Sequence, residues 1–327
     1  MNSVFLYILL FFIILALEFV YFNLARRFSI LDVPNERSSH QVPVIRGGGV
    51  IFLFASLFSF ALFRESFPWL LGGIIIVALI SFLDDIKPTP ALLRITAQAI
   101  AMMLLFQEIT LFQWQWWLII LGMIFFVGVL NAFNFMDGIN GITGIHALIN
   151  LISFGYIHFL ISPLNNITLL YATLLATVIF LWFNFRTKAV CFAGDIGSIL
   201  LAYIQIFFLM ELILATQNII WILMFLVFGV DTVITIIHRL MKGKNIFKAH
   251  RSHLYQFLAN ELNWSHRSVA LLYGMVQLLV NVILIISYEK SSMVAPLITT
   301  SFITTVYLLS RYRSLKILRN NPSNRKS

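Results

Sequence analysis

The sequence predicts an all-α protein embedded in a membrane, and three observations support this prediction. Of the 327 residues, 60% are hydrophobic and only 11% are charged, and the mean hydropathy is +0.93. A soluble domain carries about 25% charged residues, so a soluble globule is excluded. The apolar residues form eleven stretches, most of them close to the length of about 20 residues that a membrane helix needs. Finally, the basic residues gather in alternate loops between these stretches.

The eleven stretches follow one another so closely that no separate soluble domain fits between them. The first stretch lacks the positively charged segment that precedes the apolar part of a cleaved signal peptide, so we interpret it as the first span. We expect one membrane domain over residues 1–310 and a basic tail over 311–327. The expected spans are 4–24, 48–63, 68–83, 91–108, 115–133, 143–161, 167–185, 196–213, 218–237, 267–287 and 293–310.

The basic residues predict the orientation of the chain. Assigning the loops alternately to the two sides leaves only Arg64 and Lys290, of 22 Lys and Arg, on the second side. The positive-inside rule then places the N-terminus in the periplasm and the C-terminus in the cytoplasm. The net charge of +9 is explained by this topology and by anionic lipid, so we expect no nucleic-acid partner. Cys191 is the single cysteine, so we expect no disulfide.

The predicted cytoplasmic loops contain nearly all the unusual polar residues. A transporter would place its site near the middle of the membrane, so polar groups on one side favour an enzyme. A lipid-linked sugar flippase or another polytopic transporter is the alternative. The active-site loops are expected at 26–47, 84–90, 131–142, 186–197 and 238–267.

Four aspartates, Asp84, Asp85, Asp137 and Asp195, lie at the ends of apolar stretches. Carboxylates on one face of a membrane offer the hard oxygen ligands that Mg²⁺ prefers, which indicates a metal-dependent site for a phosphorylated substrate. The alternatives are a solvated loop for the adjacent pair and a helix N-cap for Asp195. Lys87 or a metal ion would offset the charge of the adjacent pair.

Two further groups of polar residues fit such a site. Asn131, Asn134 and Asp137 share one face of a helix by their spacing, and they should face protein or a watery cleft; polar contacts between helices are the alternative. The group His250, Arg251 and His253 is suited to phosphate oxygens. A zinc site is disfavoured there, because no pair of histidines at helical spacing has a third ligand.

Two smaller features of the chain, Asp231 and the glycine run at 46–49, each allow two interpretations. Asp231 lies about two helical turns before His238, and we expect it to be a functional or a structural partner of the last cytoplasmic loop. The run Arg46-Gly-Gly-Gly49 either binds an anion through its backbone amides or forms a flexible loop.

Six motifs occur in the chain in the order DVPNERSSH, RGGG, FLDDIKP, NAFNFMDGINGI, GDIGS and HRSHLYQ. Together they resemble one family, the polyprenyl-phosphate N-acetylhexosamine-1-phosphate transferases. They are closest to the branch that starts bacterial O-antigen chains with 6-deoxy-N-acetylhexosamines or N-acetylglucosamine. The resemblance implies ten core helices plus one C-terminal helix. It also implies transfer of N-acetylhexosamine-1-phosphate from a UDP-sugar to undecaprenyl phosphate, with Mg²⁺ or Mn²⁺ and release of UMP.

The resemblance also implies a role for each matching residue. Asp195 matches a metal ligand. Asp84 and Asp85 match a catalytic pair that either activates and positions the lipid phosphate or binds the metal, and Asp84 is the second expected metal ligand. The nucleotide contacts would be Asp137, Phe192, Asn134 and Asn140. The contacts to phosphate and substrate would be Asn131, Arg46, His40, His250, Arg251 and His253.

Two departures from the family pattern bear on the choice of sugar. Asn140 stands where many members have a second acid, and His253-Leu-Tyr-Gln256 replaces a run of three histidines. A CDP-alcohol phosphatidyltransferase is set aside, because Ile139-Asn-Gly follows Asp137-Gly138 where that family has Ala-Arg. The expected partners are a UDP-N-acetylhexosamine, undecaprenyl phosphate and membrane lipid. We expect the chain in the bacterial inner membrane with its site facing the cytoplasm, and its apolar outer faces would allow a homodimer.

Overall fold

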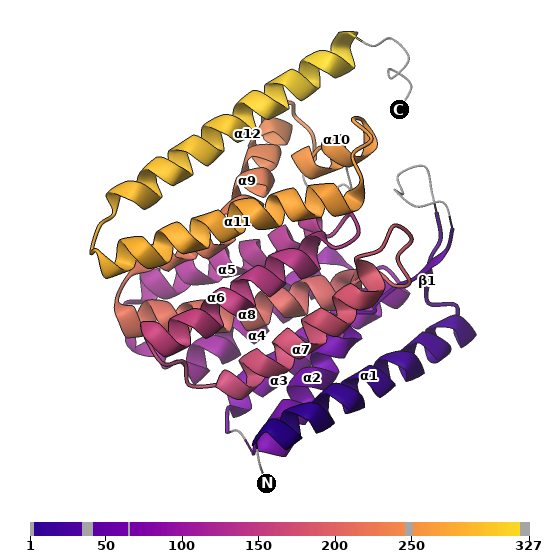
Figure 1. Ribbon diagram of the computed structural model, residues 1–327, viewed down its shortest axis with the longest axis vertical. Coiled ribbons are helices and arrows are strands. Elements are labelled where there is room, and N and C mark those ends of the chain that lie inside the picture. Colours follow the sequence, from indigo (N-terminus) through magenta and orange to yellow (C-terminus); the bar gives the residue numbers. More distant parts are fainter. Residues whose placement is uncertain (1–2, 35–41, 65, 246–250, 321–327) are drawn as a thin grey trace.

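Eleven helices of the bundle follow the eleven predicted stretches one for one (Figure 1). The computed structural model describes residues 3–34, 42–64, 66–245 and 251–320, with side chains described as far as residue 313. Its elements are α1 (Ser3–Arg27), β1 (Leu31–Asp32), β2 (Val44–Ile45), α2 (Val50–Phe63), α3 (Pro68–Ile86), α4 (Ala91–Glu108), η1 (Leu111–Gln113), α5 (Trp116–Met136), α6 (Ile142–Leu160), α7 (Ile167–Asn184), α8 (Gly194–Thr216), η2 (Ile219–Phe225), α9 (Leu226–Met241), α10 (Leu254–Asn260), α11 (His266–Glu289) and α12 (Val294–Asn320).

The prediction of an all-α membrane protein is confirmed. Ten helices of the described part are long and apolar enough to cross a membrane. The helix α2, with 14 residues, spans about 21 Å, which is shorter than the hydrocarbon core of about 30 Å. The strands β1 and β2 form a small antiparallel pair. The last helix runs ten residues beyond the predicted end at 310, to Asn320. The assignment of the two sides to cytoplasm and periplasm stays a prediction.

Helix ends are set by local chemistry. Pro68 opens α3, where its missing N–H costs nothing, and Pro88 follows its end. Asn166 caps α7 by accepting a hydrogen bond from the amide of Leu169 at 3.0 Å. The start of α3 is closed from another helix, because the Glu108 carboxylate accepts a bond from the amide of Leu70 at 2.8 Å.

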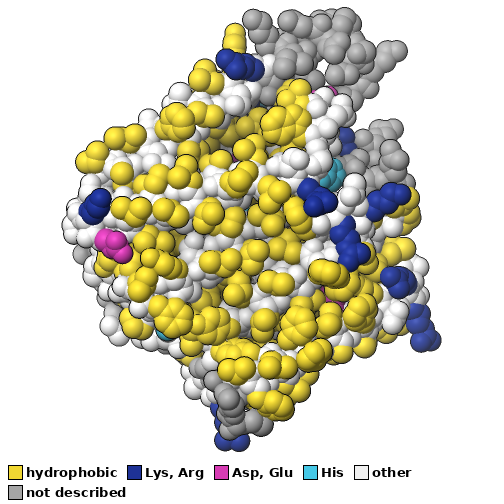
Figure 2. All heavy atoms as spheres, in the orientation of Figure 1, with side chains coloured by type: hydrophobic (Ala, Val, Ile, Leu, Met, Phe, Trp, Pro, Cys, Tyr) yellow, Lys and Arg dark blue, Asp and Glu magenta, His cyan; other side chains and the backbone are white. Residues whose placement is uncertain are grey.

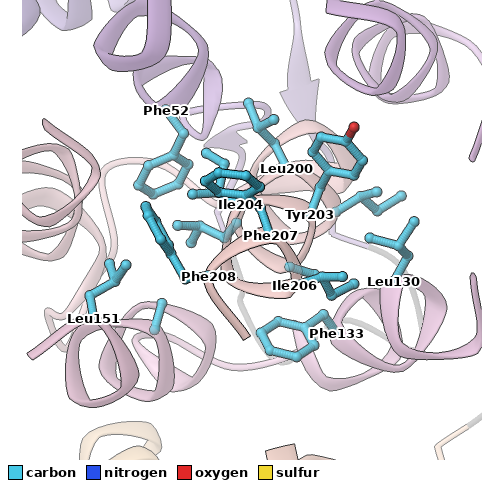
Figure 3. Close-up of a cluster of buried hydrophobic side chains, with 14 of the residues drawn as sticks. Phe52, Leu130, Phe133, Leu151, Leu200, Tyr203, Ile204, Ile206, Phe207 and Phe208 are labelled. Atoms are coloured by element: carbon cyan, nitrogen blue, oxygen red, sulfur yellow. The ribbon is translucent and has the colours of Figure 1, made fainter. Parts of the chain in front are cut away.

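The helix α8 lies at the centre of the bundle. In its most apolar window 83% of the residues are buried, against 17% in α5 and in α12. It packs against α2, α3, α5 and α6. Figure 3 shows its Leu200, Tyr203 and Phe207 surrounded by side chains of neighbouring helices. Because α8 is held on all sides, its first turn has a fixed position, and the site is built on that turn.

Polar side chains in the bundle interior repair an irregular helix. The span that contains η2 and α9 begins with seven residues of 3-10 helix, a length that leaves backbone groups poorly bonded. Gln277 accepts from the amide of Val227 at 3.1 Å and donates to the carbonyl of Leu223 at 3.2 Å. Asn150 donates to the carbonyl of Met224 at 3.0 Å. These interior amides are therefore explained by structure, without a transport path.

The outer surface of the bundle suits lipid. Figure 2 shows apolar side chains across the middle of the face and basic side chains gathered along one edge. Helices α1 and α12 expose large apolar side chains along their length, such as Phe12 and Phe302. A protein with this surface is stable only where hydrocarbon covers it.

Candidate active site

The predicted polar loops meet at one end of the bundle, which we call the site end. It contains the last turn of α3, the first turn of α8 and the segment 44–49 that leads into α2. The helix α2 leads away from this end and α3 returns to it, so Asp84 and Asp85 lie beside Asp195 although about 110 residues separate them.

Asp85 closes the start of α8. Its carboxylate accepts hydrogen bonds from the amides of Asp195 at 2.9 Å and Ile196 at 3.0 Å. Nε of Arg46 donates to the same carboxylate at 2.8 Å. A negative charge at a helix N-terminus satisfies open amides and interacts favourably with the helix dipole. The cap of α8 is therefore Asp85, and the interpretation of Asp195 as that cap is wrong.

Asp84 and Asp195 face each other beside two arginines. Asp84 accepts bonds from the amide and the hydroxyl of Thr89, at 2.6 and 2.7 Å. Nη1 of Arg94 lies 3.0 Å from an oxygen of Asp84 and 3.7 Å from an oxygen of Asp195. Nη2 of Arg46 lies 3.7 Å from Asp195. The two carboxyl groups are within hydrogen-bonding reach of each other, so a proton or a cation must stand between them.

Lys87, which the sequence suggested as the positive charge beside Asp84 and Asp85, is exposed. The charges of Asp84 and Asp85 are offset by Arg94 and Arg46 instead. Burial by itself would lower the pKa of Arg46, but Asp85 and Asp195 outweigh burial and raise it. Both arginines are only about one-third exposed, at 33% and 37% of their side chains. Their ion pairs with Asp85 and Asp84 fix these two positive charges at the edge of the site.

The donor atoms at this point fit a magnesium ion. Mg²⁺ in phosphate-transfer sites is usually bound by one or two carboxylates together with the phosphates of the substrate. Asp84 and Asp195 supply such a pair because their carboxyl groups face each other, whereas Asp85 is bonded to the first turn of α8 and to Arg46. Within the described residues no three acidic, histidine or cysteine side chains form a complete metal cage. A metal at this place would therefore complete its coordination with oxygens of substrate or water.

The glycine run contributes close packing, and two of its three backbone amides are bonded to protein carbonyl groups. The amide of Gly48 donates to the carbonyl of Phe192 at 2.8 Å, and the amide of Gly49 donates to that of Ala193 at 3.0 Å. A β-carbon at Gly49 would collide with the α-carbon of Gly197 in α8. The segment is thus pinned to the loop before α8 and not a flexible loop, which places Arg46 against Asp85.

The residues next to this contact have separate surroundings. Cys191 is fully buried, and burial raises the pKa of its thiol, so it is a poor nucleophile. Phe192, three residues before Asp195, is half-buried. Its backbone amide donates to the carbonyl of Ile45 at 2.8 Å.

The amide stripe on α5 divides between two neighbouring helices. Asn134 donates to the hydroxyl of Ser198 at 3.3 Å and is hydrogen-bonded to Asp195, so it belongs to the site. Asn131 instead donates to Gln98 of α4 at 2.7 Å. The structure therefore gives Asn131 a contact between helices and not a contact to the three aspartates.

Asp137 and Asn140 follow α5 at the site end. Burial raises the pKa of Asp137 to about 7, with a further contribution from the charge of Asp85. Asn140 donates to the carbonyl of Arg186 at 2.8 Å, and its amide bonds to the ring of His266 at 3.4 Å. Asn140 is buried, and its hydrogen bonds connect two loops of the protein. The resemblance instead gives this residue a contact with the nucleotide.

The loop between α9 and α10 forms a basic cavity together with these two helices. His253 is buried, and its Nδ1 lies 2.9 Å from Oδ1 of Asp231. Asp231 is thus tied to the loop as a structural partner of His253. The cavity has a volume of about 200 Å³ and a single acid in its lining. Its charged and histidine lining residues are His238, Arg239, Lys242, Lys244, Arg251, His253, Glu261 and Arg311. His40 and His250 lie outside the described residues.

Several residues of the site end had no signal in the sequence. Arg94 and Thr89 complete the surroundings of Asp84. Thr89 lies between Pro88 and Pro90, and Arg94 lies in the first turn of α4. Ser198 lies in a quoted motif but was not assigned. Arg311 was placed in a polar tail, yet it is buried in α12 at 7% exposure.

The fold and the site define a class: a polytopic membrane protein with paired aspartates and arginines at one end of its bundle. Comparison with known proteins shows which proteins the chain is similar to. Residues 67–213, from α3 through most of α8, match the family "Glycosyl transferase family 4". This segment supplies Asp84, Asp85, Asn134 and Asp195.

Known relatives extend the similarity over more of the chain. The chain is 25% identical to a probable undecaprenyl-phosphate N-acetylglucosaminyl 1-phosphate transferase of Bacillus subtilis, over 77% of this chain and 75% of that protein. It is 27% identical to an undecaprenyl-phosphate alpha-N-acetylglucosaminyl 1-phosphate transferase of Yersinia pestis, over 79% and 76%. It is 33% identical to a phospho-N-acetylmuramoyl-pentapeptide-transferase of Dictyoglomus turgidum, over 46% and 54%. The chain is therefore similar to polyprenyl-phosphate N-acetylhexosamine-1-phosphate transferases, the family that its motifs resemble.

Proposed function

We propose that this protein transfers N-acetylhexosamine-1-phosphate from a UDP-sugar to undecaprenyl phosphate and releases UMP. The observation that carries the proposal is the pair Asp84 and Asp195, held face to face between Arg46 and Arg94 at a membrane surface. The similarity to undecaprenyl-phosphate transferases of two bacteria supports it. We further propose that the site end faces the cytoplasm of a bacterial inner membrane, where UDP-sugars are made.

The reaction joins two polyanions, and each part of the site has a task in it. An oxygen of the lipid phosphate attacks the sugar-side phosphorus, a new P–O bond forms, and the bond to the UMP phosphate breaks. Such a reaction needs positioning and charge stabilisation more than covalent chemistry. Arg46 and Arg94 supply fixed charge beside the aspartates. The basic cavity with Arg251 and His253 suits the phosphates of the donor.

A bound Mg²⁺ would neutralise the diphosphate and stabilise the charge that develops on UMP. Asp84 and Asp195 are the residues that would hold it, with Asn134 bonded to Asp195 from α5. Asp85 has a different part: it orients the first turn of α8 and keeps Asp195 in place. In this proposal Asp85 is a positioning residue and does not touch substrate.

Purified protein, undecaprenyl phosphate and a panel of UDP-N-acetylhexosamines test the proposal through release of UMP. The panel contains the glucosamine, galactosamine, fucosamine and quinovosamine donors, so it also tests the proposed O-antigen branch. We expect Asp84→Asn and Asp195→Asn to lose transfer while they insert normally, and EDTA to abolish wild-type transfer. Glu108→Gln, the same change at the other end of α3 and α4, is the matched control and should stay active. Full activity of either aspartate variant refutes the assignment.

A further inference from the structure

The helix α12 carries two buried polar side chains on an otherwise exposed surface. Tyr307 and Arg311 are 6% and 7% exposed. They are four residues apart, so they lie one above the other on the same helical face. Their neighbours Leu308, Leu309 and Tyr312 are exposed. A tyrosine and an arginine at the lipid-covered end of a bundle are costly unless specific partners bond them.

Hydrogen bonds connect both side chains to Asp231 in α9. The hydroxyl of Tyr307 donates to Oδ1 of Asp231 at 2.9 Å. Nη1 of Arg311 donates to that hydroxyl at 2.9 Å and to the hydroxyl of Thr235 at 2.8 Å. Arginine has only donors, so the Tyr307 oxygen must accept from Arg311 and can use its own proton toward Asp231. Arg311 therefore sets the direction of the bond from Tyr307.

Asp231 in turn holds the loop that forms the basic cavity. Its Oδ1 lies 2.9 Å from Nδ1 of His253, and Tyr273 of α11 donates to Oδ2 at 2.7 Å. The amides of Leu254 and Tyr255 approach the same carboxylate at 3.3 and 3.4 Å. The start of α10 and the ring of His253 are thus fixed by one buried carboxylate. His253 and Arg311 both line the cavity.

We propose that α12 belongs to the catalytic machinery: Tyr307 and Arg311 are positioning residues that orient the ring of His253 in the donor cavity through Asp231. The inference rests on the proposed function for the identity of the ligand, a nucleoside diphosphate sugar. It concerns a helix outside the segment 67–213 that defines the family match. Groups that orient metal-binding histidines change metal affinity or activity by about 10–100-fold when they are mutated, and we expect the lower end of this range at His253.

Tyr307→Phe is the first test, because it removes one hydroxyl and keeps the ring that packs on α9. We expect it to raise KM for the UDP-sugar about tenfold and to leave KM for undecaprenyl phosphate unchanged. Tyr312→Phe is the matched control, the same change on an exposed position of α12, and it should behave as wild type. Arg311→Met should resemble Tyr307→Phe, and Arg311→Lys, which keeps a donor, should recover part of the loss.

The double variant decides whether the effect passes through His253. In a His253→Gln background, Tyr307→Phe should cause no further loss, because the ring that it positions is already gone. Two independent losses that multiply would overturn the inference, as would an equal rise of both KM values from Tyr307→Phe alone.

A measurement without activity separates this inference from the proposed function. In protein labelled with ¹⁵N-histidine, the ring signal of His253 is assigned by its absence in His253→Gln. Tyr307→Phe should shift this signal, and Tyr312→Phe should not. If the wild type releases no UMP but the signal shifts, the proposed function fails and the positioning by α12 stands. An unshifted signal overturns the positioning.

Discussion

Asp85 provides the most direct test of how this site is built, because its carboxylate joins the first turn of α8 to Arg46. Three donors approach it: two amides of α8 at 2.9 and 3.0 Å and Nε of Arg46 at 2.8 Å. In Asp85→Asn the side-chain oxygen can keep the two donors at Oδ1, but the new NH₂ group then faces the amide of Ile196. One hydrogen bond to a charged group is lost, at about 1.5–3 kcal/mol, and two others lose their charge.

The expected cost is therefore about 3 kcal/mol, close to that of removing one partner of a buried ion pair. For a protein of this size that loss lowers the apparent melting temperature by roughly 5 °C. A thermal-shift assay in detergent measures it, with Asp84→Asn as the matched control. Asp84 bonds to Thr89 and Arg94 but also faces the carboxyl group of Asp195. Removal of its charge relieves this like-charge contact, so its variant should melt within about 2 °C of wild type. The reasoning fails if Asp85→Asn is as stable as wild type or if Asp84→Asn is the less stable of the two.

Three further predictions follow from the site geometry. Asn134→Ala should reduce UMP release at least tenfold, because Asn134 is bonded to Asp195. Asn131→Ala, which loses a bond to Gln98, should lower the melting temperature and leave KM for the donor unchanged. The reverse pattern would contradict the different roles of these two asparagines. The Asp137 carboxyl has a pKa of about 7 against an ordinary 3.8, so its contribution to stability is present at about pH 4 and is lost as pH rises to about 7. Asp137→Asn should therefore melt higher than wild type at pH 8.5 and approach it at pH 5, and a gap that is constant with pH would refute this. Gly49→Ala should prevent stable folding, since a β-carbon there meets the backbone of Gly197, while Gly128→Ala in an open position should fold normally; equal yields of both in detergent would count against the close contact.

The cap of α8 shows what local patterns can and cannot predict about this site. The sequence predicted that Asp84, Asp85 and Asp195 matter, because carboxylates at span ends are costly without a purpose. It did not distinguish their parts. Asp85 bonds to the first turn of α8, while Asp84 faces Asp195. This difference depends on how α3 and α8, about 110 residues apart in sequence, lie against each other.

The stripe of Asn131 and Asn134 makes the same point within one helix. Their spacing correctly predicted that both project from α5, but α5 packs against α4 and α8 at once, and the two amides bond to different neighbours. Tyr307 and Arg311 gave no signal at all, since a polar residue near the end of a last span is ordinary in a membrane protein.

The sequence by itself determined the eleven helices and the chemistry gathered in the loops between them. Hydropathy acts on each segment locally, so a window of about 20 residues is enough to recognise a span. Tertiary structure alone decided which carboxylate caps, which faces a partner carboxylate, and which helix supports the basic cavity. Those outcomes depend on hydrogen bonds between helices that are far apart in the chain, and their geometry exists only once the bundle has packed around α8.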